Sequence, residues 1–185
     1  MKILLTIVFV TCLSAMGVHA QAGWLNAKTI KNWNKAGEAA PKAPKSEFAE
    51  VNDNCKTMIR PATTPLDKTL TAAGWYLVGA VQIFGDLSAL EVAGGFDGNC
   101  RPMDYNLFVF SGETYIGSGS PVLMQSREDG SLSDFQLWND HLSVTYVRYA
   151  KSDPFCCPSR TSTLFLGIAD KTLKPGDLFT QKISQ

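Results

Sequence analysis

The sequence has very few of the side chains on which most catalytic and metal sites depend. It contains two histidines, and we expect His19 to be removed with an export signal, which leaves His141 alone. Zinc and related metals favour clusters of histidine and cysteine, and a serine or cysteine nucleophile needs a nearby base. The sequence therefore predicts no catalytic residue, no metal site and no cofactor.

An excess of charge of either sign is also lacking. The chain has 17 basic and 17 acidic residues, and removal of Lys2 with the signal leaves 16 against 17, a net charge of about −1. A nucleic-acid partner would require a basic face. The charge balance therefore predicts that the protein does not bind nucleic acid.

Long hydrophobic runs are absent as well. The longest, Ile3–Val10, is interrupted by Thr6 and is shorter than the ~20 apolar residues of a membrane span, so we expect no spanning segment. It follows Lys2 and precedes Val18-His19-Ala20, which has the small residues of a signal-peptidase site. Residues 1–20 are thus predicted to be a cleavable signal peptide. The protein is expected to be exported, either to the periplasm or to the exterior.

Cleavage before Gln21 would leave four cysteines, namely Cys55, Cys100, Cys156 and Cys157. An even number in an exported chain predicts two structural disulfides. Adjacent Cα atoms lie about 3.8 Å apart, whereas disulfides prefer about 4.4–6.8 Å, so a Cys156–Cys157 bond would be strained. We therefore expect Cys55 and Cys100 each to bond one member of the adjacent pair. The strained ring is the alternative, as a redox switch.

Residues 21–54 have the composition of a leader or linker. Pro41-Lys42-Ala43-Pro44-Lys45 is typical of extended or disordered chain. Trp24–Lys35 has the pattern of a short amphipathic helix, with Lys28, Lys31 and Lys35 on one face and Ile30 and Trp33 on the other. Such a helix would bind a surface or pack on the domain. A single disulfide-bridged domain is expected over residues 55–185.

The periodicity of residues 55–185 predicts an α+β fold. Thr64-Pro65-Leu66-Asp67 is a helix start, and the helix is expected to end at Gly74. The rest predicts about seven strands in a mainly antiparallel sheet, covered by that helix. The expected strands are 75–84, 89–96, 105–110, 114–117, 133–138, 142–149 and 161–168. Residues 105–110 are apolar on both faces and should be central.

Several residues invite a chemical interpretation that their context weakens. His141 follows a predicted hairpin turn, and Gly117-Ser118-Gly119-Ser120 does not fit the Gly-x-Ser-x-Gly pattern of serine hydrolases. Asp97-Gly98-Asn99 with Asp104 offers oxygen ligands, but the spacing is not that of a calcium loop. Most aromatic side chains should be core. Two or three of them could form an exposed patch for a polymer or a protein.

The sequence from Cys100 onward resembles a known family. The residues that carry the likeness are Cys100–Asn106, Tyr115-Ile116-Gly117, Arg148-Tyr149 and Asp153–Arg160. Over roughly residues 75–170 this order resembles the LppP/LprE-type lipoproteins of the bacterial envelope. The resemblance implies a bacterial envelope or secreted protein without an established enzyme activity, and it supplies no catalytic residues. Cys12 lies inside the apolar run, so cleavage after Ala20 predicts a protein without a lipid anchor.

Together these features predict a non-enzymatic binding or interaction module whose partner is a protein or an envelope polymer. Two alternatives belong to other classes. One is an inhibitor of a secreted enzyme that uses the loop 154–160, in which Arg160 would be essential. The other is a cell-wall or extracellular hydrolase that acts through carboxylates, several of which remain in the sequence.

Overall fold

The computed structural model describes residues 23–154 and 156–183. The predicted signal peptide lies outside these residues. The elements in chain order are η1 (Gly23–Asn26), η2 (Asp53–Met58), α1 (Pro65–Ala72), β1 (Tyr76–Phe84), β2 (Leu87–Ala93), β3 (Gly95–Phe96), β4 (Pro102–Met103), β5 (Asn106–Ser111), β6 (Thr114–Ser118), β7 (Ser131–Leu137), β8 (His141–Arg148), β9 (Arg160–Ala169) and β10 (Thr172–Lys182). The predicted α+β fold, dominated by antiparallel strands with a short helix, is confirmed.

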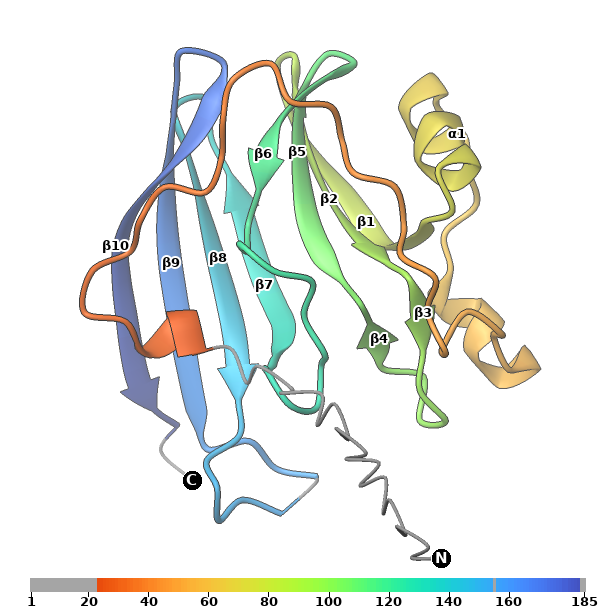
Figure 1. The fold of residues 1–185 in the computed structure, drawn as a ribbon, viewed down its shortest axis with the longest axis vertical. Coiled ribbons are helices and arrows are strands. Elements are labelled where there is room, and N and C mark those ends of the chain that lie inside the picture. The colour runs from red at the N-terminus through yellow and green to blue at the C-terminus, as the bar shows by residue number, and fades with distance from the viewer. Residues whose placement is uncertain (1–22, 155, 184–185) are drawn as a thin grey trace, which may run out of the picture.

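Two four-stranded antiparallel sheets form the body of the protein, in the orders β1-β2-β5-β6 and β10-β9-β8-β7. Figure 1 shows them facing each other, with α1 beside the first sheet. Each predicted strand corresponds to a strand here, and the second one divides into β2 and the short β3, which pairs with β4. The last strand, β10, was not predicted, and it pairs with β9 along the edge of the second sheet.

A side chain joins the two sheets where β1 approaches β7. The Gln82 amide nitrogen donates to the Phe135 carbonyl, and the Leu137 N–H donates to Gln82 Oε1 at 2.9 Å. The amide therefore satisfies backbone groups on the edge strand β7. Paired in this way, the edge is less available for unwanted strand pairing.

The apolar residues form two clusters, one on each side of the first sheet. The larger one fills the space between the sheets, with Leu107, Val109, Val144 and Leu164 among its members. The smaller one lies under α1 and includes Leu70, Trp75, Leu90 and Phe108. Five of the six residues of β5 are buried, which confirms that this strand is central and covered on both faces.

Helix α1 begins and ends where the local signals predict. The Thr64 side chain accepts from the Asp67 N–H, and the Asp67 carboxylate accepts from the Thr64 N–H, which forms a capping box. Arg60 donates to both Asp67 oxygens, at 2.8 and 2.7 Å. This hydrogen-bonded pair lowers the pKa of Asp67 well below its usual range, although burial opposes the shift. Gly74 follows with a φ of 93°, as a helix C-terminus favours.

Residues 23–50 pack along the sheets and reach across both of them (Figure 1). The amphipathic helix predicted over Trp24–Lys35 is wrong, because the only helical element there is the single 3-10 turn Gly23–Asn26. The large apolar residues nevertheless contact the domain. Leu25 is buried, and Trp24, Ile30 and Trp33 pack against the core between the sheets. Side-chain docking therefore holds this stretch without regular secondary structure.

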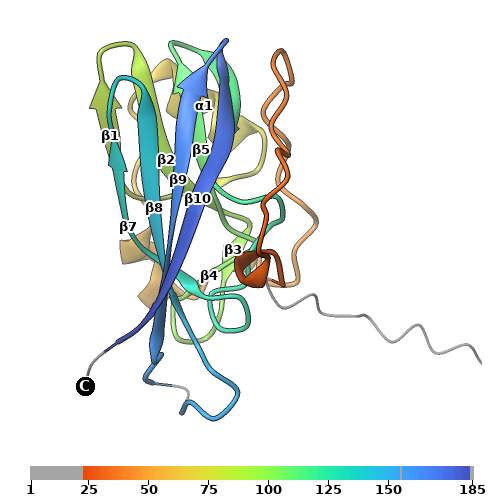
Figure 2. The same ribbon diagram turned by 90° about the vertical axis from the view of Figure 1, so that its left-hand side faces the viewer.

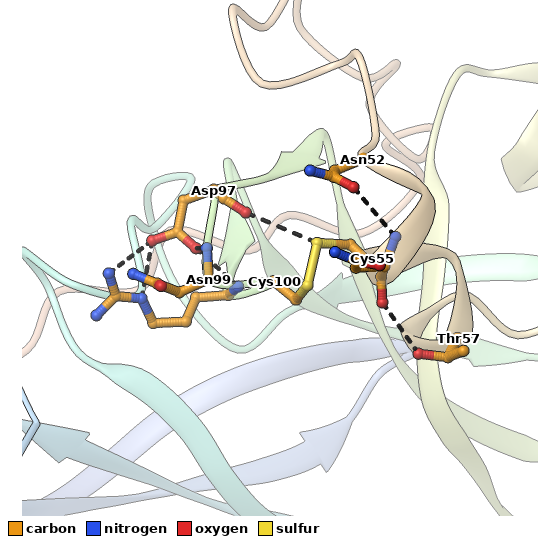
Figure 3. The surroundings of a disulfide bond; sticks show 8 residues. Asn52, Cys55, Thr57, Asp97, Asn99 and Cys100 are labelled. Carbon is orange, nitrogen blue, oxygen red and sulfur yellow. Dashed lines mark hydrogen bonds and ion pairs between the residues drawn. A yellow bond between two sulfur atoms is a disulfide. The ribbon is translucent and has the colours of Figure 1, made fainter.

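The predicted disulfide pairing is wrong. Cys55 bonds Cys100, with Cα atoms 4.9 Å apart, and Cys156 bonds Cys157. Figure 3 shows that the first bond joins η2 to the turn after β3, where the Asp97 carbonyl lies 3.9 Å from the Cys55 sulfur. Cys156 and Cys157 belong instead to the loop between β8 and β9, away from η2 in Figure 1. Distance in the fold, which residue spacing does not reveal, therefore decides the pairing.

Candidate functional site

The residues that suggested catalysis lie in structural roles. His141 stacks on Trp138, with ring centroids 4.4 Å apart, and its Nδ1 lies 2.6 Å from Asp140 Oδ1. Trp138 and Asp140 belong to the exposed turn between β7 and β8, and His141 is the first residue of β8. The hydrogen bond with His141 lowers the pKa of Asp140. These contacts describe a capped hairpin turn rather than a nucleophile and its base.

The serines of the Gly117–Ser120 stretch are buried and bonded to backbone. Ser118 Oγ donates to the Ser120 carbonyl at 2.8 Å, and Ser120 Oγ donates to the Val122 carbonyl at 2.6 Å. The Asn106 side chain ties the same turn together by donating to the carbonyls of Ser120 and Val122. The hydroxyl groups of Ser118 and Ser120 thus stabilise the chain conformation after β6.

The candidate calcium ligands are separated and occupied. Asp97 accepts from Arg101 Nε at 2.8 Å and from the backbone of Asn99 at 2.9 Å, within the turn that Figure 3 shows beside the disulfide. Burial alone would raise the Asp97 pKa, but these hydrogen bonds outweigh it and the pKa is lowered. Asp104 instead accepts from Ser46 and Gln125. Residues 23–154 and 156–183 contain no group of three or more His, Cys, Asp or Glu that could hold a metal.

The loop proposed for inhibition is folded around one carboxylate. Asp153 Oδ2 accepts from the Ala150 N–H at 2.6 Å, from the Ser159 N–H at 2.9 Å and from Ser159 Oγ at 2.7 Å. The bond from Ala150 is the largest cause of a lowered Asp153 pKa. Arg160, the residue expected to act in inhibition, is partly buried and begins β9.

Residues 23–34 are attached to the sheets by specific hydrogen bonds to distant parts of the chain. Asn34 is buried at the edge of β6, where its Nδ2 donates to the Ser118 carbonyl at 3.2 Å and its Oδ1 accepts from the Ser118 N–H at 2.8 Å. Trp33 Nε1 donates to the same carbonyl at 3.1 Å. Gly117 is required here, because a Cβ at this position would lie 2.6 Å from Asn34 Oδ1.

The other end of this stretch is held by a buried arginine. Arg148 Nη1 donates to the Leu25 carbonyl at 3.3 Å and to Ser162 Oγ at 3.2 Å, and its Nη2 donates to Asn26 Oδ1 at 3.1 Å. Burial lowers the pKa of Arg148 from its usual value. Between these two attachment points, residues 27–32 are exposed except for the partly buried Ile30.

A pocket of about 270 Å³ lies between the attachment points, lined by Trp24, Ala27, Thr29, Ile30, Lys31, Asn32, Trp33 and Pro121. The Trp24 and Trp33 rings meet edge-on, with centroids 5.5 Å apart, and Trp24 also meets Tyr146 at 6.0 Å. Ligand pockets for drug-sized molecules span ~300–1,000 Å³, so this hollow suits a part of a larger molecule.

The charged residues around the pocket are basic. Lys28, Lys31 and Lys35 are all exposed, and Lys31 lines the pocket itself. No acidic residue occurs in the sequence between residues 23 and 37, and the next one, Glu38, lies 3.7 Å from the Lys35 ammonium. The apolar hollow is therefore lined by one cationic side chain, Lys31, and Lys28 precedes it by three residues in the same stretch. We call the pocket together with Lys28 and Lys31 the tryptophan pocket.

A second exposed aromatic group lies on the outer face of the second sheet, which faces the viewer in Figure 2. Phe165 and Phe179 are 39% and 52% exposed and meet edge-on with centroids 6.0 Å apart. Hydroxyl groups surround them, including the Thr145–Thr163 pair at 3.0 Å. This is the kind of flat aromatic patch that the sequence predicted for a polymer or a protein.

Residues 85–165 match the model of a known family, described as LppP/LprE lipoprotein. No curated protein and no solved structure matches the chain. The predicted resemblance is therefore confirmed over the segment from β2 into β9. Two residues of the motifs that suggested it contact residues 23–34: Arg148 bonds Leu25 and Asn26, and Gly117 leaves room for the Asn34 side chain. Among the described residues, no helix has the length and apolar character needed to cross a membrane.

Sequence reasoning missed the residues that build the tryptophan pocket. Asn34 and Pro121 belong to no recognised motif, and Trp24 entered the sequence analysis only as the first residue of a predicted helix. The available signal was the recurrence of Trp24, Leu25, Ile30 and Trp33 within a stretch otherwise polar or small. Exposing such large apolar side chains to water is unfavourable in free energy, so their recurrence indicates that the stretch packs on the domain.

Proposed function

We propose that this chain, of which residues 85–165 match the LppP/LprE lipoprotein model, is a non-enzymatic binding protein of the bacterial envelope. Its site is the tryptophan pocket, and its ligand is the surface of an anionic lipid bilayer. The observation that supports this most directly is the pocket itself, an apolar hollow lined by Trp24, Trp33 and Lys31 within a stretch that carries lysines and no acid.

The chemistry of the pocket fits an interfacial ligand. Tryptophan is favoured at the boundary between lipid headgroups and acyl chains, because its ring is apolar and its N–H is polar. Lysines beside it are attracted to anionic headgroups. A volume of about 270 Å³ would admit the upper part of an acyl chain or a headgroup backbone, not a whole lipid. The protein would thus lie on the membrane without spanning it.

The test uses vesicles of phosphatidylglycerol and of phosphatidylcholine, with binding measured by flotation of the purified protein. We expect binding to the anionic vesicles only, and weaker binding as salt rises. Each basic residue near an anionic surface contributes ~1 kcal/mol, so the double variant Lys28→Gln/Lys31→Gln should bind about 30-fold more weakly. Ile30→Ser should also weaken binding, because it makes the pocket more polar.

Lys68→Gln provides the matched control. Lys68 is an exposed lysine on α1, far along the chain from the pocket, and its loss removes one positive charge, as the single variant Lys31→Gln does. Lys68→Gln should leave binding unchanged. Equal loss of binding in Lys68→Gln and Lys31→Gln would mean that net charge alone attracts the protein, and absence of binding to either vesicle would refute the proposal. In the latter case a soluble polymer or a protein on the Phe165–Phe179 face becomes the better hypothesis.

A further inference from the structure

The two disulfides differ in solvent exposure and in sequence separation, two properties that determine whether a disulfide stabilises a fold. Cys55 is 1% exposed, and its bond to Cys100 joins residues 45 apart in the sequence. Cys156 and Cys157 are both exposed, and they are neighbours in the sequence. One bond is thus a buried connection between distant segments, and the other lies on the surface within a single dipeptide.

A bond between adjacent cysteines cannot stabilise the fold in the usual way. A disulfide restricts the unfolded chain by closing a loop, and the restriction grows with the number of residues in that loop. Between Cys156 and Cys157 there are no residues to enclose, so the unfolded chain loses almost no freedom. The Cys156–Cys157 bond therefore does not act as a cross-link that stabilises the fold.

The loop that carries this pair keeps its shape by other means. Asp153 Oδ2 gathers the Ala150 N–H and both the N–H and the hydroxyl of Ser159, at 2.6 to 2.9 Å. The Cys157 N–H donates to the Pro154 carbonyl at 3.0 Å, which forms a local turn. None of these hydrogen bonds involves a cysteine sulfur. Opening the disulfide would thus leave the loop anchored at the ends of β8 and β9.

We propose that Cys156 and Cys157 form a redox site, which an external dithiol reduces to a dithiol and an external disulfide reoxidises, while the protein stays folded. A thiolate of the external dithiol attacks one of the two sulfurs, the Sγ–Sγ bond breaks, and the other sulfur leaves as a thiolate. The second external thiol then resolves the mixed disulfide. Two electrons and two protons pass to Cys156 and Cys157, and the external dithiol becomes a disulfide.

The proposal does not depend on the lipid-binding function and is tested on the oxidised full chain. The protein is incubated with increasing dithiothreitol, and free thiols are trapped with iodoacetamide. The masses of the tryptic peptides are then measured by mass spectrometry. The peptide 152–160 carries both cysteines of the site. We expect this peptide to be doubly alkylated at reductant concentrations that leave the Cys55–Cys100 bond intact. Tryptophan fluorescence should show that the protein remains folded under those conditions.

A variant separates a redox role from a structural one. Cys156→Ser/Cys157→Ser should unfold at the same temperature as the original protein, whereas Cys55→Ser/Cys100→Ser should unfold at a lower one. The proposal fails if peptide 152–160 becomes alkylated only when the chain unfolds. It also fails if the serine variant at 156–157 loses stability, or if non-reduced peptides link Cys156 or Cys157 to Cys55 or Cys100.

Discussion

Glu91 should destabilise the folded protein at neutral pH, and its replacement by glutamine should therefore be stabilising. Glu91 lies on β2, and it shares its face with Ala89 and Ala93, which pack in the cluster between the sheets. Its partners across the sheet are Val78 and Leu107. Among the described residues, no basic side chain forms an ion pair with Glu91. Burial raises the pKa of this carboxyl from 4.5 to about 8.

The sign and size of the effect follow from this pKa. Because the folded pKa exceeds the unfolded one, the fold favours the protonated acid. The resulting stability is complete below about pH 4.5 and is lost as the pH rises toward 8. A shift of this size corresponds to ~4–5 kcal/mol for a fully enclosed carboxyl. Glu91 keeps some contact with solvent, so we expect ~1–3 kcal/mol.

Urea unfolding followed by tryptophan fluorescence at pH 4, 6 and 8.5 measures this directly. At pH 4, Glu91→Gln and the original protein should have nearly equal free energies of unfolding. At pH 8.5 the variant should be more stable by the amount above, about 2–10 °C in melting temperature. Glu113→Gln, in the exposed turn after β5, is the matched control and should change nothing. Parallel pH profiles for Glu91→Gln and the original protein would refute the reasoning.

Two further substitutions test how the fold is held. Asp67→Asn should cost ~2–4 kcal/mol at pH 7, because it weakens the capping box and leaves Arg60 without its carboxylate partner. Because the pKa of Asp67 is lowered in the fold, this loss should be smaller at pH 2 than at pH 7, and urea titrations at both pH values would show whether it is. Asn34→Ala should lower the free energy of unfolding by ~1–3 kcal/mol, because it removes both hydrogen bonds to Ser118. Limited proteolysis should then cut residues 23–50 faster than any other part of the chain. Unchanged protection of residues 23–50 from the protease would contradict their docking through Asn34.

Local signals made the helix and most strands predictable. The start of α1 depends on Thr64, Pro65 and Asp67, which act within one turn, and these residues behave in the fold as they would in a peptide. The strand β5 was recognisable as central because both of its faces are apolar. In each case the information lies within a few residues of the element that it specifies.

The missed strand β10 shows where local signals mislead. Its middle contains Pro175-Gly176-Asp177, a combination that is typical of turns. In the structure these residues form an irregularity between two regular halves, because the register with β9 shifts between Pro175 and Leu178. Pairing with β9 on both sides of the interruption keeps the strand continuous. Proline is tolerated there because β10 is the edge strand of its sheet.

The candidate site was less predictable because it depends on contacts between distant segments. The tryptophan pocket exists only where residues 23–34 meet Ser118 and Arg148, more than 80 residues later in the chain. The disulfide Cys55–Cys100 likewise joins segments that are distant in the sequence. The argument that a bond between adjacent cysteines is strained could not reveal that the fold brings Cys55 and Cys100 together. Composition alone made residues 41–45 resemble a linker, yet the Pro41 carbonyl accepts from Trp75 Nε1 at 2.8 Å.

The family match also has a structural consequence, because residues 85–165 cannot complete either sheet by themselves. In the first sheet β2 lies between β1 and β5, and β1 ends at Phe84, before the matched segment begins. In the second sheet β9 lies between β8 and β10, and β10 begins at Thr172, after the match has ended. Each sheet thus takes one edge strand from outside the segment, and Cys100 takes its partner from outside as well. Because unpaired edges and exposed apolar faces are unfavourable in water, the flanking residues are a necessary part of the same folded unit. The segment 23–34, which forms the tryptophan pocket, belongs to that unit too, through its bonds to Ser118 and Arg148 inside the match.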